Sequence, residues 1–406
     1  MENLEIDAYS PAQMAARVEK IGIAKSHLDF LSTMVLSMLA GTFIAFGAAF
    51  YTYVVQDSTL SPTLSRLLGG LVFCLGLILV IVGGAELFTG NSLLVMACVS
   101  RKITLELLLR NWAVVFVGNL IGALGIMFLV SASGQWTGAG AAVGAKALMI
   151  ANGKVNLTLW EALSRGILCN TLVCLAVWLC FSGRSVTDKI LAILFPITAF
   201  VALGFEHSIA NMYFIPAGLL VKHDPQVLAA AQAALGKAPD LSNLTMSGFL
   251  LHNLVPVTIG NILGGGVFVG AVYWFVYLRG VAVEPVRRFM TASPISATPA
   301  TTVTEAVALM KQHNSGSVMV GEFGQSVGIV TEADIVRKGL AAGANLDSVT
   351  LDKIMSAPLI TADVKTPIYE IYRTMANRGI RHLIITQGGR QIGFVSVKDL
   401  LRKPIV

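Results

Sequence analysis

Charged residues are scarce in this chain. Lys, Arg, Asp and Glu together make up 13% of its 406 residues, whereas an ordinary soluble domain has roughly 25%. The net charge of +6 is spread along the chain, and no basic stripe with interleaved aromatic residues is present. Nucleic acid is therefore not an expected partner. A positive balance of this kind suits contact with an anionic cytoplasmic leaflet of a bilayer.

Cysteine is also sparse, and its spacing excludes the common zinc sites. All five cysteines fall in apolar stretches, where they are interpreted as small core residues. No metal site is predicted, and no nucleophile motif indicates an enzyme. The first residues lack the basic and apolar regions of a cleaved signal peptide, so none is expected.

Apolar sequence, in contrast, dominates residues 28–280. Several runs there reach the length of about 20 residues that a helix needs to cross a bilayer. We place six transmembrane helices near residues 28–55, 67–98, 111–133, 162–182, 190–220 and 248–278. An amphipathic helix at the membrane surface is predicted within residues 1–27, after the capping pair Ser10-Pro11. The distribution of Lys and Arg predicts that both termini are cytoplasmic.

Polar residues recur at matching places in the two halves of this region. Glu86 is followed five residues later by Asn91, and Glu206 is followed five later by Asn211. The third and sixth segments share the pattern Asn-x6-Gly-Asn-x2-Gly. Because three helices per half give the halves opposite orientations, the pattern indicates an inverted repeat with a central transport site. We expect an all-α membrane domain in which the second and fifth helices are broken.

Glu206 and His207 are two ionisable residues near the centre of the fifth apolar segment. Such residues cost at least a few kcal/mol at membrane depth, and they usually line a pathway. A histidine titrates near about pH 6.5, so His207 can offer a hydrogen bond or a proton to an anion. The alternative is a neutral His207, bonded to Asn170 or a hydroxyl, that binds without proton transfer. Glu206 repeats Glu86, but His207 aligns with Leu87, so we assign the proton chemistry to His207.

A second repeat occupies the C-terminal part. Met290 matches Met355, and the segment Gly328–Thr331 matches Gly393–Ser396, which sets a period of 65 residues. Each copy is predicted to contain an amphipathic helix, two short strands and a helix that begins at Thr331 or Ser396. The two copies are predicted to form a compact α/β pair.

Long motifs in the membrane part resemble the formate/nitrite transporter family. They are Gly84-Ala85-Glu86-Leu87-Phe88-Thr89, Asn111-Trp112 with Gly118-Asn119, Leu175-Ala176-Val177-Trp178, Ser182-Gly183-Arg184-Ser185, Gly204-Phe205-Glu206-His207-Ser208-Ile209-Ala210-Asn211-Met212 and Pro256-Val257-Thr258-Ile259-Gly260-Asn261. The resemblance covers roughly residues 10–280. It implies an aquaporin-like fold and a homo-pentamer, with one pore per protomer, in a bacterial or archaeal cytoplasmic membrane. The implied substrate is formate; nitrite, hydrosulfide or another small monocarboxylate is the alternative.

The resemblance also implies pore residues. Thr89 and Asn170 are expected to flank His207, and Lys154 to attract anions from an outer loop. Glu206 can orient a broken helix by accepting backbone hydrogen bonds. The implied apolar constrictions, which can select against hydrated ions, consist of Phe73, Leu77 and Leu87 on the cytoplasmic side and of Val173 and Phe200 on the periplasmic side.

The C-terminal repeat resembles a tandem pair of CBS domains through the motifs Gly328…Thr331-x-x-Asp334 and Gly393…Ser396-x-x-Asp399. The resemblance implies a cytoplasmic module that binds ATP, ADP or AMP as a regulatory ligand, while transport itself needs no cofactor. The residues placed to hold a ribose or phosphates are Thr331, Asp334, Arg381, His382, Ser396 and Asp399. The alternative is a ligand-free assembly module.

The predicted domains are residues 1–27, 28–280, 290–345 and 346–406, with a linker at 281–289. CBS pairs usually associate two-fold, which a ring of five cannot satisfy internally. Two assemblies are therefore open, a five-fold ring of modules or two pentamers joined into a decamer.

Overall fold

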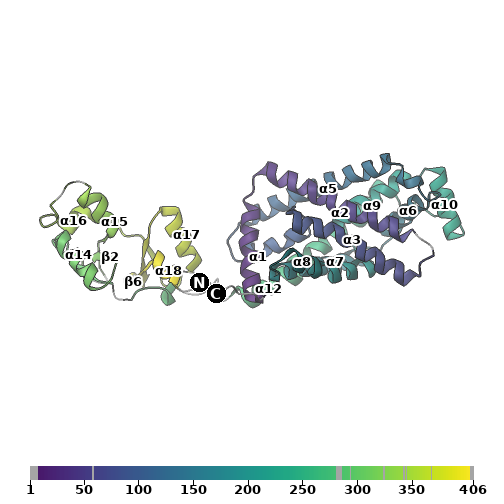
Figure 1. The fold of residues 1–406 in the computed structure, drawn as a ribbon. Coiled ribbons are helices and arrows are strands. Elements are labelled where there is room, and N and C mark those ends of the chain that lie inside the picture. The colour runs from purple at the N-terminus through teal and green to yellow at the C-terminus, as the bar shows by residue number, and fades with distance from the viewer. Residues whose placement is uncertain are drawn as a thin grey trace. The chain divides into compact units, whose positions relative to one another are not determined.

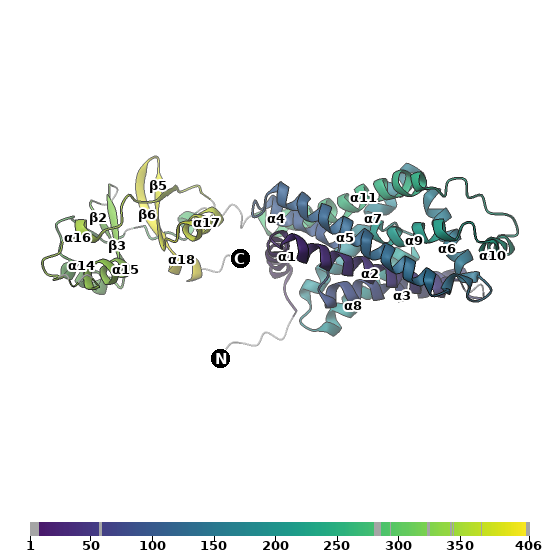
Figure 2. The ribbon, with the colours of Figure 1, turned by 90° about the horizontal axis from the view of Figure 1, so that it is seen from above.

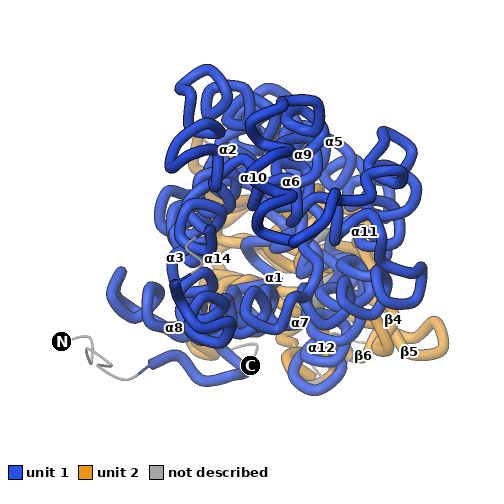
Figure 3. Tube along the Cα trace, turned by 90° about the vertical axis from the view of Figure 1, so that its right-hand side faces the viewer, with its two compact units in different colours: residues 1–278 blue, residues 279–406 orange. Residues whose placement is uncertain are grey.

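The computed structural model describes residues 8–56, 59–279, 286–292, 294–322, 325–341, 343, 345–366 and 368–402. The chain divides into two compact units, residues 1–278 and 279–406 (Figure 3). Parts of the predicted domains lie outside the described residues, among them residues 1–7, the linker residues 281–285 and residues 403–406.

Unit 1 is helical (Figure 1). Its first half contains α1 (Pro11–Ser26), α2 (Phe30–Val55), α3 (Pro62–Gly83), the 3-10 turn η1 (Gly90–Leu94), α4 (Val95–Val99) and α5 (Leu105–Ala132). After the turn η2 (Gln135–Thr137), the second half contains α6 (Ala142–Val155), α7 (Leu159–Ser182), α8 (Val186–Ala202), α9 (Ser208–Val221) and α10 (Pro225–Leu235). The last helix, Gly248–Tyr277, consists of η3 (Gly248–Leu254), α11 (Val255–Ile262), η4 (Leu263–Ala271) and α12 (Val272–Tyr277).

Five helices among the described residues are long and apolar enough to cross a membrane: α2, α3, α5, α7 and the last helix. The remaining predicted crossing is divided between α8 and α9, which are shorter. The second predicted crossing is likewise interrupted, between α3 and η1. The predicted all-α membrane domain with two broken helices is therefore confirmed.

Side chains at the helix starts explain where the crossings begin. Each of five residues accepts a hydrogen bond from a backbone N–H of the first turn that would otherwise lack a partner. These N-caps are Asp29, Ser61, Thr104, Thr158 and Ser185. They set the ends of the crossings at the points where the sequence changes from polar to apolar.

Glycines allow the same close helix pairing in both halves. A Cβ at Gly122 of α5 would lie 2.0 Å from the carbonyl oxygen of Met38 in α2. A Cβ at Gly264 of the last helix would lie 2.2 Å from the carbonyl oxygen of Ile167 in α7. Small residues of this kind let helix backbones approach within a bilayer. The two halves are thus built on one repeated contact.

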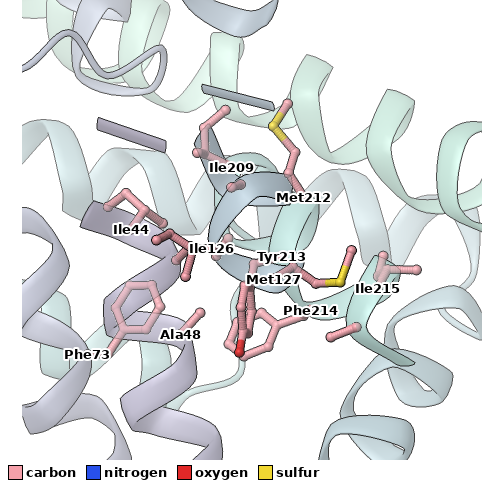
Figure 4. Packing of buried hydrophobic residues seen from close by; sticks show 14 of the residues in the cluster. Ile44, Ala48, Phe73, Ile126, Met127, Ile209, Met212, Tyr213, Phe214 and Ile215 are labelled. Carbon is pink, nitrogen blue, oxygen red and sulfur yellow. The ribbon is translucent and has the colours of Figure 1, made fainter. Parts of the chain in front are cut away.

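The core of unit 1 surrounds α9. Its side chains Tyr213 and Phe214 pack against Ile44 of α2 and Met127 of α5 (Figure 4). Tyr213 and Met127 are both buried. Helix α9 is therefore a central element of the bundle, although its length alone does not qualify it as a crossing.

Unit 2 contains two copies of one α/β arrangement (Figure 2). The first copy has β1 (Ser296–Ala297), α14 (Val303–Gln312), β2 (Ser317–Val320), β3 (Gly328–Thr331), α15 (Glu332–Asp334), η6 (Ile335–Leu340) and α16 (Leu351–Ile354). The second has β4 (Thr361–Asp363), α17 (Ile368–Arg378), β5 (His382–Gln387), β6 (Arg390–Ser396) and α18 (Val397–Arg402), and the turn η5 (Val286–Arg288) precedes both.

Each copy places its middle strand between a parallel and an antiparallel neighbour, in the orders β1-β2-β3 and β4-β5-β6. The strand starts Ser296 and Thr361, and likewise Ser317 and His382, are separated by the predicted period. Met319, Ile329, Ile384 and Phe394 form a shared cluster between the two sheets. The predicted α/β pair is confirmed.

The linker prediction is wrong at its C-terminal end. Val286 and Phe289 are buried in the core of the second copy, where they contact a cluster that includes Ile368 and Leu383. The chain next to them also pairs with strand β6, because Thr291 exchanges backbone hydrogen bonds with Phe394. Sequence that precedes the first copy thus completes the second copy.

We predict that Gly122→Ala lowers the thermal stability of the protein in detergent. The added Cβ would meet the Met38 carbonyl oxygen, and overpacking of this kind typically costs about 1–3 kcal/mol. Gly125→Ala is the matched control, since a Cβ at Gly125 meets no atom within 4 Å. Equal melting temperatures for the two variants would contradict the tight pairing of α2 with α5.

Candidate functional site

Two glycines end the broken helices. Gly84 follows α3 with a φ of 75°, and Gly204 follows α8 with a φ of 71°. Residues other than glycine rarely adopt these left-handed conformations. From these points the chain runs without regular structure to η1 and to α9. Both breaks carry a carboxylate, Glu86 and Glu206, into the protein interior.

His207 caps α9 and contacts the other break. Its Nδ1 accepts a hydrogen bond from the backbone N–H of Ala210 at 3.1 Å. Its Nε2 lies 3.0 Å from Oγ1 of Thr89. Because Nδ1 accepts, the neutral ring carries its proton on Nε2. His207 and Thr89 are both buried, so the two breaks meet at this polar pair.

Asn170 of α7 holds the backbone of Thr89 through a hydrogen bond. Its Nδ2 donates to the carbonyl oxygen of Thr89 at 3.2 Å and to that of Asn261 at 2.6 Å. Cys174 also directs its thiol to the Thr89 carbonyl, at 3.3 Å. Asn170 Nδ2 also donates to the Ser92 hydroxyl at 3.2 Å, and the described residues show no hydrogen bond from Asn170 to His207.

The second break is held by a network around the Glu206 carboxylate. Lys154 Nζ lies 2.8 Å from one carboxylate oxygen of Glu206. The other oxygen accepts from Asn211 at 2.7 Å and from Asn253 at 3.2 Å. Asn253 also donates to the backbone carbonyl of Lys154 at 2.9 Å. Lys154 therefore belongs to helix α6 and to an ion pair, and not to an outer loop as predicted.

The first break has a corresponding network of other residues. Lys25 Nζ lies 2.9 Å from a carboxylate oxygen of Glu86 and 3.0 Å from Asn91 Oδ1. Asn91 donates to Glu86 at 2.7 Å and to Asn111 at 3.0 Å. The sequence patterns did not single out Lys25 as a site residue. The available signal was its spacing, because Lys25 and Lys154 each precede the capping residue of the next helix, Asp29 or Thr158, by four positions.

Two further asparagines satisfy the backbone at the breaks. Asn119 accepts from the N–H of Phe88 at 2.9 Å and donates to the carbonyl of Glu86 at 2.9 Å. Asn261 accepts from the N–H of Ser208 at 2.9 Å and donates to the carbonyl of Glu206 at 3.0 Å. These are the asparagines of the repeated Gly-Asn pattern, whose role the sequence did not specify.

The two networks are not identical: Asn253 donates to the Glu206 carboxylate, whereas no bond from Asn111 to Glu86 is found among the described residues. Asn91 Oδ1 accepts from Lys25, whereas the equivalent Asn211 Oδ1 is buried and lacks a partner among the described residues. Lys154 instead lies 5.3 Å from the centre of the Phe214 ring. The ammonium group of Lys154 is therefore less fully engaged than that of Lys25.

Two hollows lie beside these networks. The larger, of about 300 Å³, is lined by Leu77 and Leu87 and by three cations, Arg17, Lys25 and Lys189, with Glu86 as the acidic lining residue. The smaller, of about 70 Å³, is lined by Lys154, Glu206, His207, Phe73 and Phe200, among others. The larger hollow has an excess of cations, which raises the local concentration of anions, whereas in the smaller one Lys154 is paired with Glu206.

The predicted grouping of Phe73 with Leu77 and Leu87 is wrong. Phe73 packs edge-to-face on Phe200, with ring centroids 5.7 Å apart, and both line the His207 hollow. A one-turn difference along α3 separates Phe73 from Leu77, so the two side chains reach different hollows. Val173 is buried but lines neither hollow.

Five of the six residues predicted to bind a nucleotide line one cleft of about 400 Å³ between the two copies of unit 2. They are Thr331, Arg381, His382, Ser396 and Asp399. Burial and the neighbouring Arg381 lower the pKa of His382, so its ring is neutral at pH 7. Lys398 and Glu332 add one charge of each sign to the lining.

Asp334 is the exception, because it is not among the residues that line this cleft and its carboxylate is bonded within its own copy. It accepts from the Thr331 hydroxyl at 2.6 Å and from the Ser356 hydroxyl at 2.9 Å, and it pairs with Lys338 at 2.8 Å. Burial alone would raise its pKa, but these contacts outweigh burial and lower it. The spacing of its motif could not reveal the contacts with Ser356 and Lys338.

We predict that Lys25→Met lowers the melting temperature, because it leaves the buried Glu86 carboxylate without a cation. Removing one partner of a buried pair costs about 3–5 kcal/mol. Adding Glu86→Gln should restore most of the lost stability, and Lys20→Met, at an exposed site of the same helix, is the control. Equal melting temperatures for the Lys25 and Lys20 variants would contradict a structural role for the network.

Comparison with known proteins matches both units. A family model described as formate/nitrite transporter matches residues 12–275, and a CBS domain model matches residues 286–341 and 351–405. The formate channel FocA of Escherichia coli strain K12 is 44% identical over 277 residues, which cover 67% of this chain and 96% of that protein. The probable formate transporter of Methanothermobacter thermautotrophicus is 40% identical, with 66% and 97% covered.

Solved structures give the same result. A pentameric formate channel with formate bound is 40% identical and has a TM-score of 0.56, covering 62% of this chain and 98% of its own. An FNT family ion channel is 28% identical with a TM-score of 0.54, covering 65% and 98%. The chain therefore belongs to the formate/nitrite transporter family of membrane proteins, with two CBS domains in its C-terminal unit.

Proposed function

We propose that this protein is a channel for formate, that it assembles as a homo-pentamer with a pore in each protomer, and that an adenine nucleotide on the CBS unit regulates it. The names of its relatives support formate and the pentamer. The observation that carries the proposal is the contact of His207 with Thr89 where the two broken helices meet. We place the channel in the cytoplasmic membrane with both termini in the cytoplasm.

The chemistry of the pair suits a small anion. An anion that enters hydrocarbon loses its hydration, at a cost of roughly tens of kcal/mol by Born solvation. The Nε2–H of His207 and the hydroxyl of Thr89 are neutral donors that can replace part of that hydration. Lysines near both hollows attract the anion, and the apolar side chains Leu77, Leu87, Phe73 and Phe200 exclude hydrated ions.

Proton transfer from His207 to formate would let neutral formic acid cross the apolar stretches. The ring must then hold a second proton, on Nδ1, where it would face the N–H of Ala210. Each transfer therefore requires loss of the α9 cap. We propose that the neutral, capping ring is the resting state and that proton transfer takes place only when this cap opens.

We predict that His207→Ala lowers formate uptake into proteoliposomes at least about tenfold, since the loss of one donor to a charged group costs about 1.5–3 kcal/mol. The control is His252→Ala, at an exposed position of the last helix. Unchanged uptake in His207→Ala would exclude the proposed role. Uptake by His207→Gln between pH 5 and 8 separates binding by a neutral donor from proton transfer. Glutamine can donate a hydrogen bond but cannot titrate, so this variant should retain uptake only if proton transfer is not required.

The CBS cleft provides the proposed regulatory site. Arg381 and Lys398 can meet phosphates, while Ser396 and Asp399 can meet a ribose. We predict that ATP or AMP changes the formate flux of the full chain at least about twofold, and that Arg381→Ala reduces this response, because a phosphate loses a charge-assisted contact worth about 1.5–3 kcal/mol. Flux that is indifferent to all adenine nucleotides would leave the module an assembly element.

Assembly is tested by mass. In detergent, the full chain and a chain that ends at residue 279 should both give five-fold masses if the CBS units form a ring. A full chain of ten protomers, beside a truncated chain of five, would instead indicate two pentamers joined through their CBS units.

A further inference from the structure

Unit 2 contains two clefts that are related by its internal repeat. The first, which we call the Asp399 cleft, is the one described above, and Thr291 and Ile295 line it. The second, the Lys338 cleft, has a volume of about 290 Å³ and is lined by Ser356 and Ile360 at the equivalent positions. A tandem repeat of this kind provides, in principle, two ligand sites.

Beside the Lys338 cleft, the carboxylate of the motif is already bonded to two residues that line the cleft, Ser356 and Lys338. One oxygen of Asp334 accepts from the backbone and hydroxyl of Thr331, at 3.0 and 2.6 Å. The other accepts from Ser356 at 2.9 Å and faces Lys338 Nζ at 2.8 Å. The relative exposure of Asp334 is 9%. No oxygen of this carboxylate remains for the hydroxyls of a ribose.

The ammonium group of Lys338 is engaged as well. Besides Asp334, it donates to the backbone carbonyl of Ile354 at 2.9 Å and to the hydroxyl of Ser356 at 3.1 Å. An ammonium group has three donors, and these contacts use them. Lys338 thus lies in this cleft as a bound cation and is unavailable to a phosphate.

The Asp399 cleft has the same cap but a different balance of contacts. One oxygen of Asp399 accepts from the backbone and hydroxyl of Ser396, at 2.9 and 2.6 Å. Its other oxygen has no hydrogen-bond partner among the described residues. Thr291 and the equivalent Ser356 both pair through their backbones, with Phe394 and Ile329; the difference is that the Ser356 hydroxyl donates to Asp334, whereas the described residues show no such bond from Thr291 to Asp399. Lys403, at the position of Lys338, lies outside the described residues.

The linings also differ in chemistry. Arg381, Lys398, Ser315 and Ser317 line the Asp399 cleft. The Lys338 cleft has aliphatic side chains instead, including Leu359, Ile380 and Ile384, and Lys338 is the charged lining residue. A phosphate would meet two cations in the first cleft, which Glu332 and Asp399 also line, and in the second it would meet a lysine that is already paired with Asp334.

We propose that the CBS unit has one nucleotide site per chain, in the Asp399 cleft, and that Lys338 closes the repeated cleft by binding to Asp334 in place of a ligand. This inference rests on the proposed function, because it specifies where and how many times the regulatory nucleotide binds. It also assigns opposite roles to two aspartates that the sequence motif presents as equivalent.

The test counts bound nucleotide on the full chain in detergent, by equilibrium dialysis with radiolabelled ATP and AMP. We expect one molecule per chain and a loss of at least about tenfold in affinity for Asp399→Asn, because a charged acceptor of two hydroxyls is removed. The double variant Asp334→Asn with Lys338→Met removes the competing pair together, leaves no unpaired charge, and should retain the affinity and the single site.

Outcomes separate this inference from the proposed function. Two nucleotides per chain, or equal losses from the Asp399 variant and the double variant, would overturn the single-site assignment while leaving nucleotide regulation intact. Binding of no adenine nucleotide would overturn both. A last variant, Lys403→Met, tests whether the lysine equivalent to Lys338 blocks the Asp399 cleft. We expect the affinity and the number of bound nucleotides to stay unchanged, because Asp399 then acts on the ligand directly. If this variant binds a second nucleotide per chain, the assignment of the Asp399 cleft as open is overturned.

Discussion

The structure depends on hydrogen-bond partners for the backbone groups at the two helix breaks. Backbone groups freed by a break must find partners within the protein, since lipid offers none. Asn119 and Asn261 supply these partners, because each donates to the backbone carbonyl of a glutamate and accepts from the N–H of the residue two positions later. The carboxylates themselves are neutralised by Lys25 and Lys154. The polar interior is thus the condition for having a site between the breaks.

Hydrogen bonds also fix the positions of the site residues. Thr89 is fixed through its carbonyl by Asn170, and His207 is fixed as the cap of α9. Thr89 belongs to the first break and His207 to the second, so a shift of either break would disturb their contact. The asymmetry of the pair follows from the repeat, because one break supplies a leucine where the other supplies the histidine.

Sequence patterns predicted what local chemistry determines. Apolar runs located the crossings, the recurrence of Glu86 and Glu206 located the breaks, and the 65-residue period predicted the paired α/β copies. The misassigned residues depend on rotation or on distant contacts. The side on which Phe73 lies depends on the rotation of α3, and Lys25 meets its carboxylate only in the folded chain. Asp334 and Asp399 share a motif, yet contacts with Ser356 and Lys338 separate their roles.

The position of Lys25 has a consequence for how the fold is divided. Helix α1 was expected to rest on the membrane surface, but its lysine matches the lysine of α6 in contact, partner and distance to the next cap. Each structural half therefore begins one helix earlier than its first crossing. Each half of unit 1 thus contains the cation for its own buried carboxylate, so neither half depends on the other for charge balance.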